Sequence, residues 1–279
     1  MQSLARSAVT AACDQAGILL SDLGAETVLL HIQNGLTCLT PPSGIVLAQS
    51  LGLTEVRVLA IDGVCSEPIA AIEIGVLMLS AGRCERVIIS AAADFLGVID
   101  PKDVATVGLF GAGAGAMVLT LPSDGENPTH IHSLQWQTHT KYADLGRIPI
   151  HGYQSGSAGV QISAGFYEMD GQGLARAALR VLPGVLGAVL KESQWRREDI
   201  GLVIAHQPNA KLLDIGVRAL RLDPKTVPMP VCHLGNMGPA SLLVNLSLAK
   251  EQGLLIPELK VLLLAFGLGF SCGAAAVEW

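Results

Sequence analysis

Hydrophobic and polar positions follow two different periods along the first half of the chain. A helical pattern covers residues 4–20, and an Ala- and Leu-rich helical stretch covers residues 69–81. Short, predominantly apolar runs occur at 27–30, 56–61 and 87–91, with Arg57 as the one charged residue among them. Runs of this kind are typical of strands covered on both faces. The pattern therefore predicts alternating helices and strands in buried, mostly parallel sheets.

The second half repeats this order of elements. A Phe-Gly-x-Gly motif, which begins at Phe110 in the first half and at Phe266 in the second, precedes the last predicted strand of each half. The repeat predicts two related units, which we place at residues 1–125 and 126–279. The corresponding helical and apolar segments of the second half are 174–192, 202–205, 226–231, 240–251 and 260–264.

An α/β fold with two pseudo-repeated halves follows from this order, in layers α-β-α-β-α. The strand ends of both halves meet on one face, where open α/β sheets bind ligands. The halves also differ. Residues 130–138 form a predicted strand without a counterpart in the first half, so we expect the first sheet to be one strand short. Extra residues around 97–107 predict a surface loop in the first half.

Hydropathy raises the question of a membrane span. Half of the 279 residues are hydrophobic, the mean hydropathy is +0.48, and the most apolar stretch is 261–277. Gly267, Gly269 and Gly273 recur inside that stretch, which favours a strand and a tight turn over a spanning helix. The N-terminus has no basic stretch followed by an apolar run. We therefore expect neither a membrane partner nor a signal peptide.

Charge and cysteine content narrow the partners further. Only 15% of residues are charged, the net charge is −6, and no cluster of Lys and Arg could follow a phosphate backbone. We therefore do not expect nucleic acid to be a partner. The six cysteines lie far apart, without a CxxC pair or a zinc-type Cys/His spacing. We expect a reduced, cytoplasmic protein without a metal or another cofactor.

Cys65 lies in the segment 61–68, Ile-Asp-Gly-Val-Cys-Ser-Glu-Pro, between a predicted strand and a predicted helix. Pro68 fits the first helical turn. We expect the dipole and free N–H groups of that helix to lower the pKa of the thiol. A buried structural cysteine is the competing interpretation. Glu67 could act as an acid or base, but a carboxylate that caps the first turn explains it better.

The internal repeat brings two further polar residues to Cys65. Asn236 occupies the turn that corresponds to the Cys65 turn, and His206 ends a neighbouring strand. Singly, His206 could be a core histidine and Asn236 a turn residue. Together, the three residues suggest covalent catalysis by a Cys/His/Asn group.

The glycine-rich motifs are not predicted to bind a dinucleotide. In residues 110–116, Phe-Gly-Ala-Gly-Ala-Gly-Ala, the strand follows the glycines and no helix comes after them, so the phosphate-binding context is missing. Close packing is the better explanation. In residues 266–273, Phe-Gly-Leu-Gly-Phe-Ser-Cys-Gly, packing competes with a turn that points a backbone N–H at a thioester oxygen.

These segments resemble ketoacyl synthase III, a condensing enzyme with the thiolase fold. The resemblance covers nearly the whole chain. His206-Gln207-Pro208-Asn209 is similar to the family's HQAN, and Gly235-Asn236 to its GN. Residues 110–116 resemble FGDGAGA, residues 266–273 resemble AFGxGFTWG, and Met169-Asp170-Gly171 resembles MxG.

The resemblance implies an acyltransferase that carries the acyl group on Cys65. His206 and Asn236 would stabilise the enolate formed when a malonyl-type extender loses CO₂, as in fatty-acid, polyketide or related metabolism. The backbone N–H groups of Cys65 and Leu268 would form the oxyanion hole. The implied substrates are acyl thioesters of acyl carrier protein or CoA. Substrate or carrier binding would involve Gly171, Asn209 and Lys211, although Lys211 fits a solvated surface lysine equally well.

Departures from the family pattern leave alternatives open. Ser66, Glu67 and Pro68 replace small residues, Ala112 replaces an aspartate, and Cys272 replaces a tryptophan. The family's first strand and its CoA-clasping segment have no counterpart, so we expect either carrier-delivered acyl groups or a strand supplied by a partner. Acyl transfer to an alcohol or amine is the second hypothesis. A subunit that pairs with a homologous condensing enzyme, as a homodimer or heterodimer, is the third.

Overall fold

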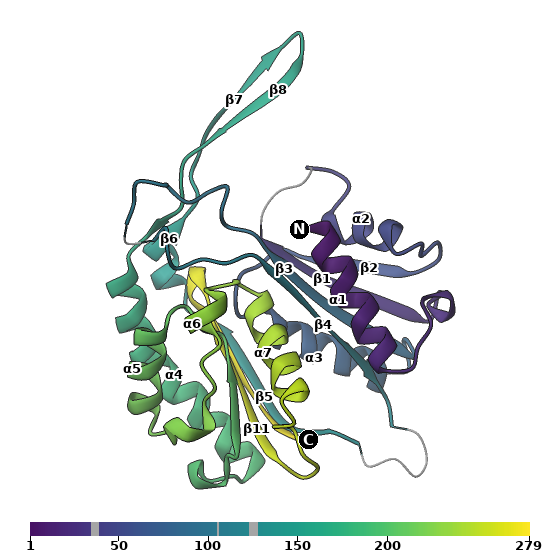
Figure 1. Ribbon diagram of the computed structural model, residues 1–279, viewed down its shortest axis with the longest axis vertical. Coiled ribbons are helices and arrows are strands. Elements are labelled where there is room, and N and C mark those ends of the chain that lie inside the picture. The colour runs from purple at the N-terminus through teal and green to yellow at the C-terminus, as the bar shows by residue number, and fades with distance from the viewer. Residues whose placement is uncertain (35–38, 105, 123–127) are drawn as a thin grey trace.

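The structure is a computed structural model that describes residues 1–34, 39–104, 106–122 and 128–279. Two halves lie side by side in it (Figure 1). The predicted boundary between residues 125 and 126 lies outside the described residues, and it stays a proposal. The helices are α1 (Gln2–Gln15), α2 (Ser43–Ser50), α3 (Glu67–Ser80), α4 (Gly171–Ser193), α5 (Ala210–Leu220), α6 (Val231–Leu234) and α7 (Ala240–Glu251).

The strands form two four-stranded sheets and two separate two-stranded pairs. The first sheet has the order β2-β1-β3-β4 and the second the order β10-β11-β12-β5. The pairs β6-β9 and β7-β8 stand apart from them. The strands are β1 (Thr27–Asn34), β2 (Arg57–Ile61), β3 (Arg86–Ala93), β4 (Gly113–Thr120), β5 (His130–Thr138), β6 (Gly146–Arg147), β7 (Ile150–Gly156), β8 (Gly159–Ala164), β9 (Glu168–Met169), β10 (Leu202–Ala205), β11 (Lys260–Phe266) and β12 (Ser271–Glu278).

Strand direction differs from the prediction of mostly parallel sheets. β1 is parallel to β2 and to β3, and β10 is parallel to β11. The other three pairs, β3-β4, β11-β12 and β12-β5, are antiparallel. The prediction was wrong because no crossover helix separates the last strands of each half. A short connection such as 267–270 can only reverse the chain.

The predicted α-β-α-β-α layering is confirmed. α1 and α2 cover the outer face of the first sheet, and α4 and α5 cover the outer face of the second. α3 and α7 lie between the sheets and contact both. One hydrophobic cluster fills this central layer, and two further clusters fill the outer layers. The long apolar strands are buried because each sheet has a helix layer on both faces.

The predicted strand at 226–231 does not form. A 3₁₀ turn, η4 (Pro224–Thr226), and the short helix α6 occupy this segment. Pro228 and Pro230 lack the N–H groups that a strand donates to its neighbour, which explains the difference. The strand predicted at 130–138 is confirmed as β5. Both sheets nevertheless have four strands, so the expectation that the first would be one strand short was wrong.

The glycines of residues 110–116 let the two halves approach closely. A Cβ atom on Gly111 would lie 2.1 Å from the carbonyl oxygen of Leu234, and one on Gly113 would lie 2.5 Å from the sulfur of Met237. Gly115 is similarly close to Leu243. The packing interpretation of this motif is therefore confirmed. Leu109 to Gly111 also bond to the Asn236 turn, so this contact joins the halves beside the candidate site.

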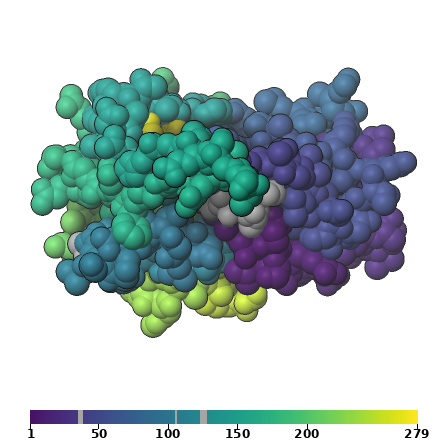
Figure 2. All heavy atoms as spheres, turned by 90° about the horizontal axis from the view of Figure 1, so that it is seen from above, coloured from purple at the N-terminus to yellow at the C-terminus, as the bar shows by residue number. Residues whose placement is uncertain are grey.

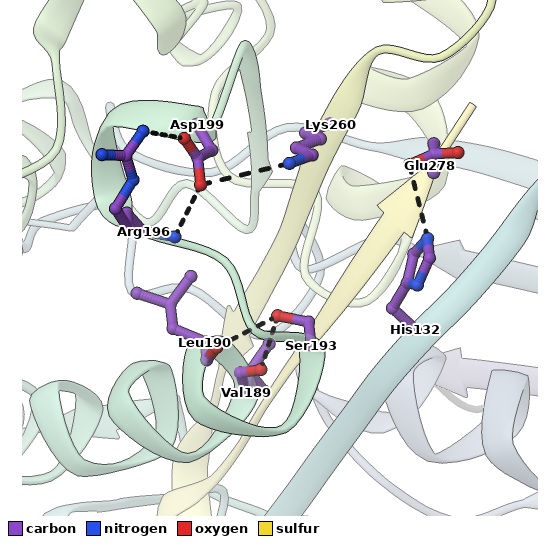
Figure 3. Close-up of polar contacts among 8 residues, drawn as sticks. All are labelled: His132, Val189, Leu190, Ser193, Arg196, Asp199, Lys260 and Glu278. Carbon is purple, nitrogen blue, oxygen red and sulfur yellow. Dashed lines mark hydrogen bonds and ion pairs between the residues drawn. The ribbon is translucent and has the colours of Figure 1, made fainter.

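Helix α4 is the one described helix that is long and apolar enough to cross a membrane by length and composition. More than half of its most apolar window is buried, because one face packs on the second sheet. Beyond its end, a polar cluster fixes the chain at the amino end of β11 (Figure 3). Asp199 pairs there with Arg196 at 3.0 Å and with Lys260 at 4.0 Å. We interpret α4 as a core helix.

The β7-β8 hairpin projects from the end of the molecule at which β1 and β3 finish (Figure 1). Seen from above, it lies in front of the boundary between the two halves (Figure 2). Tyr153 and Val160 on the hairpin are well exposed. The predicted surface loop at 97–107 is confirmed for the residues described there, since they contain no helix or strand.

Candidate functional site

Cys65 lies in the turn between β2 and α3. The side-chain amide of Asn34 donates a 2.7 Å hydrogen bond to the carbonyl oxygen of Gly63, which ties this turn to the end of β1. Pro68 lies in the first turn of α3, as predicted. The five cysteines that the structure describes are all unpaired, and Cys65 is one of them.

The expectation that the pKa of Cys65 would be low was wrong. Burial, and next the Glu67 carboxylate, raise the pKa of Cys65 to about 12. α3 begins at Glu67, after the thiol, and the dipole of its N-terminus does not offset the lost solvation of a thiolate. Cys65 is therefore a neutral thiol near pH 7, and it needs a base when it attacks.

Glu67 caps the turn that carries Cys65, as the preferred interpretation predicted. Its Oε2 atom accepts hydrogen bonds from the N–H of Val64 at 2.6 Å and from the hydroxyl of Ser66 at 3.4 Å. A Cβ atom on Gly63 would lie 2.1 Å from the Cγ atom of Glu67, so only glycine leaves room for this arrangement. Burial raises the pKa of Glu67, and its hydrogen bonds oppose that shift.

The Glu67→Gln variant should have a more reactive Cys65. The glutamine side chain keeps an oxygen that can accept the Val64 N–H but removes the negative charge that raises the pKa of Cys65. We expect alkylation of Cys65 by iodoacetamide to be about ten-fold faster at pH 8, with the rate still rising above that pH because burial remains. Peptide mass spectrometry measures the rate. The exposed Glu251→Gln variant is the control, and an unchanged rate for Glu67→Gln would contradict the assignment.

His206 directly follows β10 and is 3% exposed. Its backbone N–H donates to the carbonyl oxygen of Leu264 at 2.8 Å, and its ring meets the Phe266 ring edge-on with centroids 5.9 Å apart. Burial lowers the pKa of His206 to about 4, against a backbone hydrogen bond with Gly238 that acts in the opposite direction. The imidazole is thus neutral near pH 7 and can accept a proton.

Asn236 lies in the turn before α7 and is 8% exposed. Its Oδ1 atom accepts a 2.9 Å hydrogen bond from the N–H of Gly238, which leaves the Nδ2 group as the donor. Its backbone N–H donates to Leu109 at 2.8 Å, and its carbonyl oxygen accepts from Gly111 at 3.0 Å. Residues of the first half therefore hold the amide of the second half in place.

Gln207 positions this site, and the sequence analysis assigned it no role. Its side-chain amide donates to the carbonyl oxygen of Pro228 at 2.7 Å and accepts from the N–H of Val231 at 3.1 Å. It thereby attaches the segment without the predicted strand to the end of β10. Its place directly after His206 in a strand-end motif is the signal that could have identified it.

Two cavities meet at Cys65. The smaller, of about 70 Å³, is lined by Cys65, His206 and Asn236 together, so the structure brings the three predicted residues to one space. The larger, of about 400 Å³, is also lined by Cys65 and Asn236 and extends toward Val98 and Arg147. Another cavity, of about 440 Å³ and lined by α3, β4 and β5, contains none of the three.

The other predicted residues separate into two groups. Gly171 and Asn209 line the smaller cavity, and the Oδ1 atom of Asn209 caps α5 by accepting from the N–H of Leu212 at 2.8 Å. Lys211 is exposed in the first turn of α5 and lies outside both cavities. Among the described residues, no group of three or more His, Cys, Asp or Glu side chains could hold a metal ion.

The turn after β11 packs closely against the backbone of Cys65. A Cβ atom on Gly267 would lie 2.8 Å from the backbone nitrogen of Cys65 and 3.3 Å from its Cβ atom. Leu268 follows and lines both cavities. The backbone N–H groups of Cys65 and Leu268 donate to no other described residue, so both are available to a ligand oxygen.

Comparison with known proteins agrees with this geometry. Residues 59–140 match the family model of 3-oxoacyl-(acyl-carrier-protein) synthase III, and residues 190–279 match the model of its C-terminal part. A synthase III of Streptomyces coelicolor is 31% identical over 84% of this chain and 70% of its own length. The chain belongs to the 3-oxoacyl-(acyl-carrier-protein) synthase III family. These are decarboxylative condensing enzymes, so the chain is an acyltransferase-type enzyme.

Other known proteins resemble the chain over most of its length. The beta-ketoacyl-(acyl-carrier-protein) synthase III of Brucella suis is 28% identical over 99% of this chain and 84% of its own. The structure of the Pseudomonas aeruginosa synthase III superposes with a TM-score of 0.86 at 23% identity, over 100% of this chain and 83% of that one. OleA of Xanthomonas campestris gives 0.84 at 20% identity, over 100% and 80%. The predicted thiolase-like fold is thus confirmed.

Proposed function

We propose that the chain forms an acyl-enzyme at Cys65 and condenses it with a malonyl-type thioester, releasing CO₂. The observation that supports this most is the single small cavity that Cys65, His206 and Asn236 line together. Each residue has the state that its role requires. Cys65 is an unpaired thiol, His206 is a neutral base, and Asn236 has its amide nitrogen available.

Acylation comes first. The sulfur of Cys65 attacks the thioester carbonyl, and neutral His206 accepts the thiol proton as the C–S bond forms, because a thiol with a pKa of about 12 does not ionise beforehand. The N–H groups of Cys65 and Leu268 bind the oxyanion of the tetrahedral intermediate. The carrier thiolate leaves and takes the proton from His206. The products are the Cys65 thioester and a free carrier thiol.

Condensation follows at the same cavity. The bound malonyl thioester loses CO₂, and two donors bind the enolate oxygen: Nδ2 of Asn236, and the imidazole N–H of His206 in the tautomer whose proton is on the nitrogen that faces the cavity. The enolate carbon attacks the acyl carbon, a carbon–carbon bond forms, and the bond to the Cys65 sulfur breaks. The thiolate of Cys65 takes up one proton, which balances the proton delivered to the carrier in the first step. The product is a 3-oxoacyl thioester.

Carrier recognition would involve residues of the smaller cavity and of the adjacent surface of α5. Gly171 and Asn209 line the smaller cavity and are the residues that would contact the arm of a carrier protein or CoA. Lys211 would act only at the surface, against a phosphate, because it lies outside that cavity. No metal or organic cofactor enters the reaction as written. The unpaired cysteines fit our proposal that the enzyme works in the cytoplasm.

We further propose that two chains associate, as a homodimer or with a homologous condensing enzyme. β2 is one of the two edge strands of the first sheet, and Leu59 on it is 46% exposed. An exposed apolar edge strand offers unpaired backbone groups to another chain. Because β2 leads into the Cys65 turn, such pairing would also steady the nucleophile. Sedimentation of the purified 29.0 kDa chain distinguishes a single species of twice that mass from a monomer.

Product analysis separates condensation from plain acyl transfer. The enzyme is incubated with an acyl thioester and a malonyl thioester, and products are followed by mass spectrometry and CO₂ release. We expect one CO₂ for each 3-oxoacyl product. An ester or amide without CO₂ would instead establish transfer to an alcohol or amine. Failure of any thioester to add an acyl mass to Cys65 would favour a subunit that needs a catalytic partner.

A further inference from the structure

Tyr167 lies beside the nucleophile and has no part in the mechanism above. It precedes β9, and its backbone N–H donates to the carbonyl oxygen of Val98 at 2.8 Å. Its ring meets Phe110 edge-on with centroids 5.4 Å apart and Phe95 at 6.0 Å. These contacts fix the ring in an aromatic cluster, so the hydroxyl position is set by packing.

The hydroxyl group of Tyr167 lacks a strong hydrogen-bond partner. Among the described residues, its only hydrogen bond is to the sulfur of Met169, at 3.8 Å. Tyr167 is partly buried, and a thioether is a weaker acceptor than the oxygen atoms that tyrosine hydroxyls usually bind. The group is therefore a donor that a ligand oxygen could satisfy.

This donor belongs to a residue that shares two cavities with the nucleophile. Tyr167 and Cys65 both line the smaller and the larger cavity, so Tyr167 lies where the two spaces meet. Burial, and next the negative charge of a Cys65 thiolate, raise the pKa of Tyr167. The hydroxyl consequently stays protonated at any working pH and can only serve as a neutral donor or acceptor.

Two other side-chain donors of the larger cavity already bind acceptors of the protein itself. Arg147 donates to Glu168 at 2.8 Å, and Asn34 donates to the carbonyl oxygen of Gly63 at 2.7 Å. Asn236 is assigned to the enolate oxygen. The remaining wall around Tyr167 is formed by Phe95 and Phe110, which cannot donate. Among these donors, Tyr167 is the one whose position is fixed by aromatic packing and whose hydrogen bond goes to a sulfur atom alone.

We propose that the Tyr167 hydroxyl donates a hydrogen bond to an oxygen atom on the second or third carbon of the acyl group held by Cys65. The enzyme then prefers hydroxyacyl or oxoacyl thioesters to saturated ones of equal length. This specificity rests on the acyl-enzyme of the proposed function. It goes beyond that function because it assigns a substrate class and a residue that selects it.

A competition experiment tests the proposal. Equal amounts of the N-acetylcysteamine thioesters of 3-hydroxybutyrate and butyrate compete for the full-length enzyme, and intact mass spectrometry quantifies the two acyl adducts. We expect the hydroxyacyl adduct to form about five-fold faster, as one neutral hydrogen bond allows. In Tyr167→Phe, which keeps the aromatic packing, the ratio should fall to near one.

Tyr142→Phe is the matched control. The ring of Tyr142 also meets a phenylalanine edge-on, Phe270, with centroids 5.4 Å apart, but it lines neither cavity. Its variant should keep the wild-type ratio. A wild-type ratio of one, an unchanged ratio in Tyr167→Phe, or equal slowing of both adducts would overturn the proposal. Absence of any adduct on folded wild-type enzyme, judged by its melting transition, would contradict the proposed acyl-enzyme itself.

Discussion

The Cys65→Ala variant should accumulate no acyl adduct and should lose condensation by at least about a thousand-fold, because the covalent intermediate cannot form. Alanine removes only the sulfur atom from a turn held by Asn34 and Glu67, so the fold should persist. Intact mass spectrometry after incubation with an acyl thioester, together with the rate of 3-oxoacyl product formation, measures both effects.

Cys232→Ala is the control for this variant. Cys232 is an exposed free cysteine and lines neither cavity at Cys65. Its replacement should leave the adduct and the rate unchanged. An acyl mass that remains on Cys65→Ala would place the nucleophile elsewhere, and an adduct lost only with Cys232 would show that the label was a surface modification.

The Gly267→Ala variant should lose activity because the added methyl group displaces the backbone of the turn at 267–268. Its Cβ atom would lie 2.8 Å from the backbone nitrogen of Cys65 and 2.9 Å from the Cγ2 atom of Val64, and a backbone atom cannot turn away as a side chain does. The turn must shift, which moves the N–H of Leu268 away from the oxyanion position. Loss of one such donor lowers kcat by about 100- to 1000-fold. Overpacking should also destabilise the fold by about 1–3 kcal/mol.

Gly187→Ala separates backbone displacement from the general effect of adding a methyl group. Gly187 lies within α4, and a Cβ atom there would have nothing within 4 Å. Alanine should raise the free energy of unfolding by about 0.5–1 kcal/mol, because it favours the helix, and should leave kcat unchanged. Wild-type kcat in Gly267→Ala, with the melting temperature measured for both variants, would remove the Leu268 N–H from the mechanism.

The raised pKa of Cys65 changes what its acylation requires. The position of Cys65 before a helix N-terminus predicts an activated thiolate. Burial and the charge of Glu67 raise the pKa of the thiol by more than the helix dipole lowers it. Acylation should therefore depend on His206 far more than it would for a thiolate formed in advance. The same balance keeps the free enzyme less open to oxidation, since the thiolate is the form that oxidants attack.

The order of helical and apolar segments along the chain was enough to predict much of the fold. Long uninterrupted apolar runs can be buried only between helix layers, and their repetition in two halves predicts the paired sheets. The repeat also brought Cys65, His206 and Asn236 together, because equivalent strand ends meet on one face. Two predictions from the hydrophobic pattern were wrong. The short connection 267–270 makes β12 antiparallel to β11, and the prolines of 226–231 lack the N–H groups that a strand needs there.

Sequence by itself determined the layers, the family and the three candidate catalytic residues, since periodicity and motif spacing are local properties of the chain. The tertiary structure decided what depends on neighbours distant in sequence. Burial and Glu67 set the protonation of Cys65, Gly267 sets the place of the Leu268 N–H, and packing against Phe95 and Phe110 brings Tyr167 to the site. Solvation, close contact and hydrogen-bond satisfaction exist only once the two halves are packed together.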